Sequence, residues 1–126
     1  MSPAHNNRSD PMGEIHEITE KIMQFRDARD WKQFHNHKDV ALSLVLEAGE
    51  VLEHFQWKSS AEVALHGKEH KDELADELAD VAWYVFELAR DLDIDLGQAI
   101  ASKMKKNAEK YPVEKCRGRH TKYNKL

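Results

Sequence analysis

The sequence predicts an all-α protein, and three observations lead to that fold class. Apolar residues recur every three or four positions in four separate segments, which is the spacing of one helix face. No segment alternates apolar and polar residues as a strand does, and no internal repeat appears. The chain has 126 residues, 40% of them hydrophobic and 33% charged, so we expect a single domain over residues 1–126.

Helix start and stop signals divide the sequence into four helices, which we expect to form a four-helix bundle. Asp10 and Pro11 are typical of a helix start, Asn36 is a candidate cap for the second helix, and Asp95 begins the capping pattern of the fourth. Residues 58–67 are expected to be a connection. The expected helices are about 11–29, 37–57, 69–91 and 95–111.

The second helix contains Gly49 in its interior, where glycine costs about 1 kcal/mol relative to alanine. We therefore expect another helix or a ligand to approach closely there. A chain of this length buries only about two thirds of its unfolded surface, so helices with polar inner faces would be costly unless covered. We expect oligomerisation to complete the bundle.

Composition also narrows the setting. Cys116 is the single cysteine and cannot form an internal disulfide, and no apolar stretch approaches the roughly 18 residues of a membrane span. Residues 1–11 lack the apolar region of a signal peptide. We expect a cytoplasmic protein without a membrane span, in which residues 1–10 and about 112–126 are less ordered.

Charge is unevenly distributed along the chain. Residues 103–126 contain nine Lys and Arg and two Glu, which is a net +7, whereas the whole chain has a net charge of −4. A basic tail is typical of a solvated surface or of nucleic-acid contact. Beside an acidic body it also suits a polyphosphate whose metal ions bind the carboxylates.

Two acidic pairs have a spacing that suits metal binding. Glu47 and Glu50 lie about 60° apart around the second helix, and Glu77 and Asp80 form a similar pair on the third, in one stripe with Tyr84. If the two helices face each other, four like charges converge and repel. Hard oxygen ligands favour Mg²⁺, with Mn²⁺ as a possible substitute, and Mg²⁺ commonly shares its coordination with phosphates.

A solvated acidic face is the alternative for these residues, since such pairs are ordinary on helices. Glu47 and Glu50, however, are flanked by apolar residues, so their helix has little spare solvent-facing surface. A di-iron bundle is a weaker alternative, because it needs Glu-x-x-His motifs and this chain offers Glu50 with His54 four residues later.

Five ordered motifs resemble the MazG-like all-α nucleoside triphosphate pyrophosphatases, and within them the dCTP pyrophosphatase-like subgroup. The resemblance covers residues 14–123. The broad family pattern has a glutamate at the position of Leu46, and the subgroup also lacks that glutamate. A second glutamate of the broad pattern is replaced by Asp76 in this chain. The motifs are "RDWKQFH" (29–35), "EAGEVLEHFQWK" (47–58), "DELADVAWYV" (76–85), "SKMKKNAEKYP" (102–112) and "RGRHTKY" (117–123).

The resemblance implies a Mg²⁺-dependent enzyme that cleaves dCTP, or another (d)NTP, between the α- and β-phosphates to give the monophosphate and pyrophosphate. It implies that Glu47, Glu50, Glu77 and Asp80 are the catalytic and metal-binding residues. It also implies a homo-oligomer, a dimer or tetramer, with pockets formed partly between subunits. The implied substrate-binding residues are Trp31, His35, Trp57, Tyr84, Lys103, Asn107 and Lys110.

Two other functions remain open from the sequence. One is a non-catalytic helical module that binds nucleic acid through residues 103–126, which we consider the weaker hypothesis. The other is a pyrophosphatase with a different specificity, for dUTP or for damaged purine nucleotides. Stacking aromatic residues accept many bases, so the motifs alone do not rank the substrates.

Overall fold

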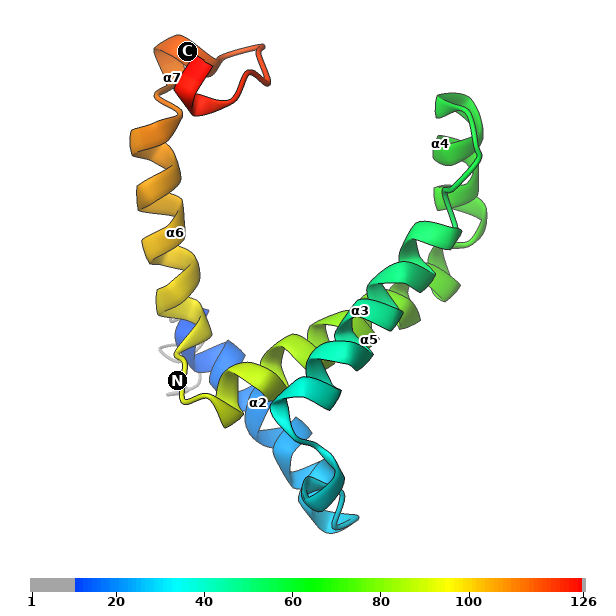
Figure 1. Ribbon diagram of the computed structural model, residues 1–126. Helices are drawn as coiled ribbons and strands as arrows, with labels where there is room; N and C mark the ends of the chain where they lie inside the picture. The colour runs from blue at the N-terminus through cyan, green and yellow to red at the C-terminus, as the bar shows by residue number, and fades with distance from the viewer. Residues whose placement is uncertain (1–10, 126) are drawn as a thin grey trace, which may run out of the picture. The chain divides into compact units, whose positions relative to one another are not determined.

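The computed structural model describes residues 11–125, and all regular elements in this range are helical, which confirms the all-α prediction. Figure 1 shows the four predicted helices as α2, α3, α5 and α6. In chain order the elements, with η for 3₁₀ helices, are α2 (Pro11–Ala28), η1 (Lys32–Phe34), α3 (His37–Glu53), α4 (Ser60–Glu69), α5 (Lys71–Asp91), α6 (Leu96–Lys110), α7 (Val113–Cys116) and η2 (Tyr123–Lys125).

One expected connection is a helix. Residues 58–67 were predicted to be a connection, but α4 begins at Ser60 and is capped by Ser59. The Ser59 hydroxyl accepts a hydrogen bond from the Glu62 backbone N–H, and the Glu62 carboxylate accepts one from the Ser59 N–H. This reciprocal capping box satisfies two backbone donors and starts the helix.

The predicted caps of the second and fourth helices are confirmed. The Asn36 side chain accepts a hydrogen bond from the Asp39 N–H at 2.9 Å, and Asp95 accepts one from the Gln98 N–H at 3.1 Å. The predicted cap at Asp10 lies outside the described residues. In the segment 112–126, where we expected less order, the structure contains α7 and η2.

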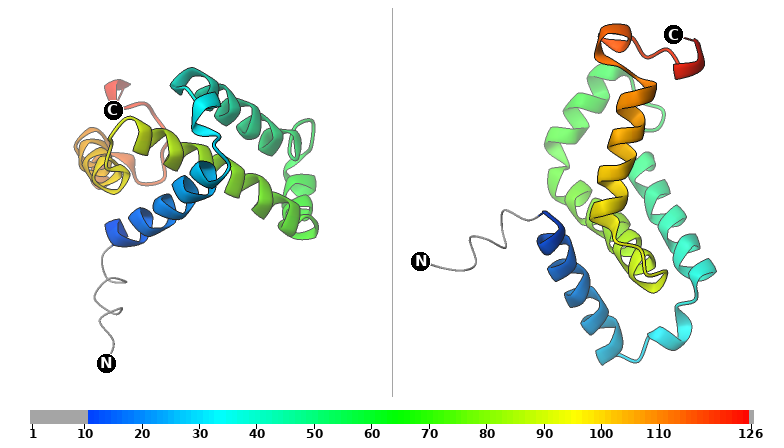
Figure 2. Two further views of the ribbon diagram at one scale, coloured as in Figure 1. Left: turned by 90° about the horizontal axis from the view of Figure 1, so that it is seen from below. Right: turned by 90° about the vertical axis from the view of Figure 1, so that its left-hand side faces the viewer.

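The chain divides into two compact units, and each is described by itself. The first comprises residues 16–94, and the described part of the second comprises residues 11–15 and 95–125. In the first unit, α3 and α5 run antiparallel and side by side, with α4 joining them at one end (Figures 1 and 2). The buried apolar side chains of this unit are Ile22, Met23, Val40, Leu74 and Ala89.

Helix α3 packs against α5 on one side, and another face of α3 is apolar and exposed. A Cβ atom at Gly49 would meet nothing within 4 Å, so the close approach that we predicted is not supplied by the described chain. Four large side chains share this exposed face with Gly49, and between 55% and 65% of their surface is accessible. We call them and Gly49 the outer face of α3: Leu42, Val45, Leu46, Gly49 and Leu52.

The second unit is built around α6. The ring of Tyr111 meets Tyr123 edge-on with centroids 6.1 Å apart, and Lys110 Nζ lies 4.8 Å from the Tyr123 ring centroid. These contacts fix η2 to the end of α6. Separately, none of the helices within residues 11–125 is both long and apolar enough to cross a membrane.

Candidate active site

Two acidic pairs lie on α3 and α5. Glu47 and Glu50 are one turn apart on α3, and Glu77 and Asp80 are one turn apart on α5. Glu47 Oε2 is buried and has no hydrogen-bond partner in the described part of the chain. Burial raises the pKa of Glu47, and the hydrogen bond to Glu50 and the charges of Glu50, Asp80 and Glu77 raise it further. The four carboxylates therefore interact, and we call them the acidic group.

Histidines border the acidic group at its α4 end. His54 Nε2 forms an ion pair with Glu77 Oε2, and His54 Nδ1 lies 2.6 Å from Nε2 of His66. The His66 ring stacks on His70 with centroids 4.1 Å apart. Burial lowers the pKa of His66, and the positive charges of His70, Lys58 and His54 act in the same direction. Sequence reasoning considered His54 only in the di-iron alternative and did not assign His66 or His70 to the site.

The acidic group is not a closed set of metal ligands. Within residues 11–125, no three or more His, Cys, Asp or Glu side chains are grouped so that they could hold a metal ion. The structure thus places the predicted ligands near one another without surrounding a common point. Their role as metal ligands stays a prediction.

A cavity of about 240 Å³ adjoins the acidic group and shares Asp80 with it. Three of its lining residues were predicted from the sequence to bind substrate: Trp31, His35 and Tyr84. Two others, Arg26 and Trp83, were not. The cavity is lined by Arg26, Trp31, His35, Asp80, Trp83 and Tyr84.

The end of α2 determines where Trp31 lies. Asp30 adopts a left-handed conformation with φ of 53°, and the Trp31 N–H donates to the Arg26 carbonyl at 3.1 Å, as in a Schellman motif. Aspartate tolerates this conformation better than most residues. The Phe25 ring then meets Trp31 and Trp83 edge-on, with centroids 5.8 Å and 5.2 Å apart. These contacts hold two aromatic walls of the cavity in place.

Tyr84 connects the cavity with the acidic group. It lies near Ser43 on α3. Burial raises the pKa of the Tyr84 phenol, and the negative charges of Glu47, Glu87 and Asp80 raise it further, whereas the Ser43 hydroxyl acts in the lowering direction. A ligand in the cavity therefore lies next to Asp80, one of the carboxylates that raise the pKa of Glu47.

Behind the cavity lies a group of paired charges, which we call the buried charge network: Arg26, His35, Glu87 and Asp91. Arg26 Nη1 donates to Asp91 Oδ2 at 2.8 Å and to Glu87 Oε2 at 3.2 Å. His35 Nδ1 lies 2.6 Å from the same Glu87 oxygen. Burial opposes the charge of Arg26, but its bonds to Asp91 and Glu87 outweigh that effect and raise its pKa. Glu87 is fully buried.

Sequence reasoning missed this network, although two signals pointed to it. The acidic stripe of α5 continues beyond Tyr84 to Glu87 and Asp91 with the same spacing of three and four. Arg26 follows Ile22 by four residues on the apolar face of α2. A cation in a core position on one helix predicts a buried anion on another, because an unpaired buried charge is costly.

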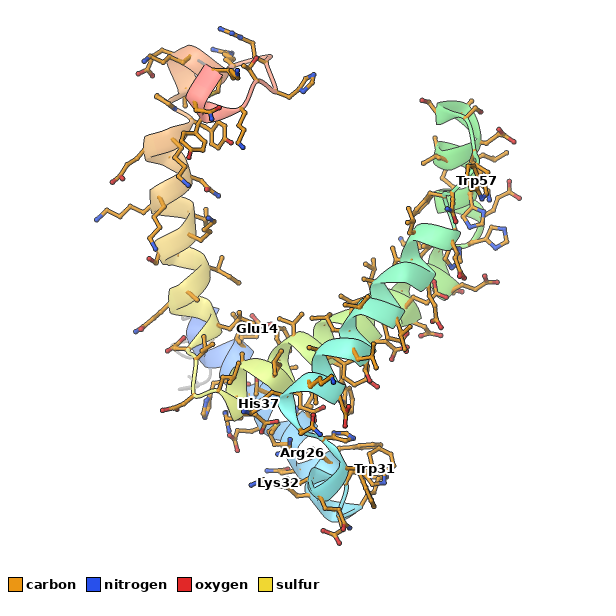
Figure 3. All side chains as sticks on the ribbon, viewed as in Figure 1. Glu14, Arg26, Trp31, Lys32, His37 and Trp57 are labelled. Atoms are coloured by element: carbon orange, nitrogen blue, oxygen red, sulfur yellow. The ribbon has the colours of Figure 1, made fainter. Side chains whose placement is uncertain are left out.

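The structure does not bring Trp57 to the cavity. Its backbone has φ of 68°, which is unusual for a bulky residue, and its side chain is 92% exposed. In Figure 3, Trp31 and Trp57 lie at opposite ends of α3. This helix has 17 residues and is therefore about 25 Å long. One nucleotide cannot touch both tryptophans of a single chain.

The three remaining predicted residues belong to the second compact unit. Lys103, Asn107 and Lys110 are exposed on α6, and their spacing of four and three places them on one face of that helix. Lys110 also contacts the Tyr123 ring. Their part in a substrate site stays a prediction.

Comparisons with known proteins agree with the resemblance seen in the motifs. The MazG-like family model matches residues 42–126. The chain is 40% identical to rat dCTP pyrophosphatase 1 over 118 residues, which is 92% of this chain and 69% of that protein. It is 36% identical to human dCTP pyrophosphatase 1, again over 118 residues that make up 92% of this chain and 69% of that protein. A crystal structure of a pyrophosphatase from Archaeoglobus fulgidus superposes with a TM-score of 0.75 and 37% identity, covering 79% of this chain and 93% of that one. This chain belongs to the MazG-like family.

Proposed function

We propose that this protein is a Mg²⁺-dependent nucleoside triphosphate pyrophosphatase that hydrolyses dCTP or a 5-modified dCTP to the monophosphate and pyrophosphate. The similarity to two mammalian dCTP pyrophosphatases and to an archaeal pyrophosphatase supports this activity. The observation that carries the proposal is the acidic group, which gathers like charges beside an aromatic cavity.

The residues of the acidic group fit a divalent cation. Glu47 Oε2 is buried without a hydrogen-bond partner in the described range, and its neighbours in the group are carboxylates. Such oxygens are the ligands that Mg²⁺ prefers, and Mn²⁺ accepts the same set. Mg²⁺ keeps several waters and binds proteins through one or two carboxylates, so a closed cage of protein ligands is not required.

Each part of the site then has a role in hydrolysis. When bound, Mg²⁺ would supply charge neutralisation for the triphosphate and lower the pKa of a coordinated water. The ion would be held by Glu47, Glu50, Glu77 and Asp80. A carboxylate of this group would accept the proton that the attacking water releases. Water adds to the α-phosphorus, the bond from that phosphorus to the bridging oxygen breaks, and pyrophosphate leaves.

The cavity supports recognition of the base. Its volume of about 240 Å³ is below the usual range for sites that hold whole drug-sized ligands, so it suits a single ring rather than a complete nucleotide. Trp31 and Tyr84 offer stacking surfaces, and Asp80 lies where the cavity meets the acidic group. The phosphates would extend towards that group. Lys103, Asn107 and Lys110 stay predicted substrate contacts from their motif alone.

We propose that the active form is a homo-oligomer, a dimer or tetramer. The outer face of α3 leaves four large apolar side chains accessible, which is unusual for a surface without a partner. Trp57 is nearly fully exposed, and it lies too far from the cavity of its own chain. A second copy that covers the outer face would allow the Trp57 of one chain to complete the pocket of the other. The single cysteine supports a reducing compartment such as the cytoplasm.

A pyrophosphate-release assay tests the activity. We expect release from dCTP in the presence of Mg²⁺, none after chelation, and a loss on the order of 100-fold in Glu50→Gln, because one anionic contact of the site is removed. The matched control is Glu17→Gln, which makes the same change at an exposed residue of α2 and should leave turnover unchanged.

Each outcome of this assay separates two hypotheses. Full turnover in Glu50→Gln would contradict the role of the acidic group. Preferential hydrolysis of dUTP or of damaged purine nucleotides would replace the proposed substrate. The absence of turnover with every nucleotide would favour the nucleic-acid-binding module.

A further inference from the structure

The buried charge network determines which nitrogen of His35 carries a proton. Glu87 Oε2 accepts from Arg26 Nη1 at 3.2 Å, and arginine has only donors to offer. The same oxygen lies 2.6 Å from His35 Nδ1, so it is the acceptor in that contact as well. His35 Nδ1 must therefore donate. In a neutral imidazole with a proton on Nδ1, Nε2 carries a lone pair and accepts hydrogen bonds.

The geometry leaves this acceptor available to a ligand. His35 lines the cavity, and its side chain is 25% exposed. Nδ1 is occupied by the fully buried Glu87, whereas Nε2 has no hydrogen bond or ion pair within residues 11–125. Because Nδ1 is engaged by Glu87, Nε2 is the ring nitrogen that remains for a ligand in the cavity. The Trp31 ring, with its centroid 6.3 Å from that of His35, limits the direction from which a flat ligand can approach.

Pyrimidine bases differ at the group that such an acceptor would contact. Cytosine presents an exocyclic amino group, which is a donor, whereas uracil and thymine present a carbonyl oxygen at the same position. A donor would pair with Nε2, but a carbonyl would bring two acceptors together in a partly buried site. Sites built around a specific hydrogen bond reject analogues strongly, because their polar groups are left unpaired.

We propose that Glu87 is a positioning residue for base selection: it fixes His35 so that Nε2 accepts from the exocyclic amino group of cytosine, which discriminates against uracil and thymine. Arg26 donates to the same Glu87 oxygen from the other side and is itself also bonded to Asp91. This inference rests on the proposed function and specifies how its substrate is chosen. Bases with a substituent at carbon 5 keep the amino group, so the contact also serves modified cytosine nucleotides.

The first measurement is nucleotide binding without catalysis. The quenching of tryptophan fluorescence should report occupancy, because Trp31 and Trp83 line the cavity. With dCMP and dUMP as probes and no divalent ion present, we expect the wild type to bind dCMP about tenfold or more tightly. In a turnover assay, the ratio of kcat/KM for dCTP to that for dUTP should show the same preference.

Three variants separate positioning from general stability. Glu87→Met removes the acceptor but leaves Arg26 bonded to Asp91, and we expect it to reduce the preference for cytosine about tenfold. Glu87→Gln keeps an amide oxygen that can accept from both neighbours, so it should restore most of the preference. Asp91→Asn is the matched control: it perturbs the same arginine without touching His35 and should leave the preference unchanged.

A spectroscopic readout is independent of binding and of turnover. The ¹⁵N chemical shifts of the His35 ring should indicate a proton on Nδ1 in the wild type and a mixture of tautomers in Glu87→Met. Equal binding of dCMP and dUMP by the wild type, an unchanged preference in Glu87→Met, or a proton on Nε2 alone would each overturn the inference. A cytosine preference in binding, without hydrolysis of any triphosphate, would instead overturn the proposed function and leave the inference standing.

Discussion

Helix α5 contributes two carboxylates to the acidic group and two to the buried charge network, and the helices opposite them differ in charge. In the network, α2 presents Arg26, which donates to both Glu87 and Asp91. In the acidic group, α3 presents further carboxylates, and Glu47 Oε2 is buried without a partner in the described chain. In the acidic group the basic partner within the described residues is His54, which pairs with Glu77, whereas Glu47 faces carboxylates. Similar side chains on one helix are therefore structural beside Arg26 and form a candidate binding site beside Glu47.

The physical basis of this difference is the cost of isolating charge. A buried anion is tolerated when cationic donors meet it, and Oε2 of the fully buried Glu87 accepts from Arg26 and His35, although its Oε1 has no partner in the described chain. The acidic group has the opposite balance, because burial and the like charges of its other members make the ionised form of Glu47 less favourable and raise its pKa. An external cation would remove that repulsion, and the following predictions test whether the two groups respond differently.

The largest expected effect is the loss of the built-in cation. Arg26→Met should lower the free energy of unfolding by about 3–5 kcal/mol, because it leaves Glu87 and Asp91 without their shared partner in a buried setting. Chemical denaturation monitored by circular dichroism measures the loss. The matched control, Lys21→Met on the exposed side of α2, should change stability little. A loss below about 1 kcal/mol in Arg26→Met would show that the network is not structural.

The fold could be predicted to the extent that each helix carried its own pattern. Long amphipathic segments with caps at Asn36 and Asp95 were found correctly, because both the apolar spacing and the capping side chain are local features. Helix α4 was missed because it has only 10 residues and no strong apolar face. Its capping box, Ser59 with Glu62, was visible in the sequence and would have located its start.

The site could be predicted only in part, because its pieces are brought together by packing. Helical spacing placed Glu47 beside Glu50, but the partners of Arg26 are more than 60 residues away and depend on how α2 meets α5. Trp31 and Trp57 were grouped by motif alone. A 17-residue helix between them already implied a separation that one base cannot span.

The next effect tests whether the acidic group binds a cation from solution. Mg²⁺ should raise the free energy of unfolding of the wild type, by about 1.4 kcal/mol when its concentration is ten times Kd. Thermal unfolding with and without Mg²⁺, at constant ionic strength set by NaCl, measures the increase. Glu47→Gln should show a much smaller increase, whereas Asp91→Asn should respond like the wild type. An equal response in both variants would place the binding elsewhere.

A smaller effect follows from the direction of the Glu47 shift. Its folded-state pKa is raised, so the folded protein holds a proton on Glu47 more readily than the unfolded chain does. With a chelator present, this residue should therefore lower stability as the pH rises from its unfolded pKa through its folded pKa. Stability curves of the wild type and Glu47→Gln should diverge over that window, with the variant more stable at the higher pH. Parallel curves would contradict the shift.

The smallest effect contrasts the outer face of α3 with a glycine on helix α4. Gly49→Ala and Gly67→Ala place the same methyl group in open space on two different helices, α3 and α4. Each should stabilise its helix by at most about 1 kcal/mol, because alanine is the better helix former. If a second copy packs closely on the outer face, only Gly49→Ala should also weaken association, as measured by sedimentation across a concentration series. Unchanged association in both variants would mean that subunits do not meet at Gly49, and the glycine would then need another explanation than close helix packing.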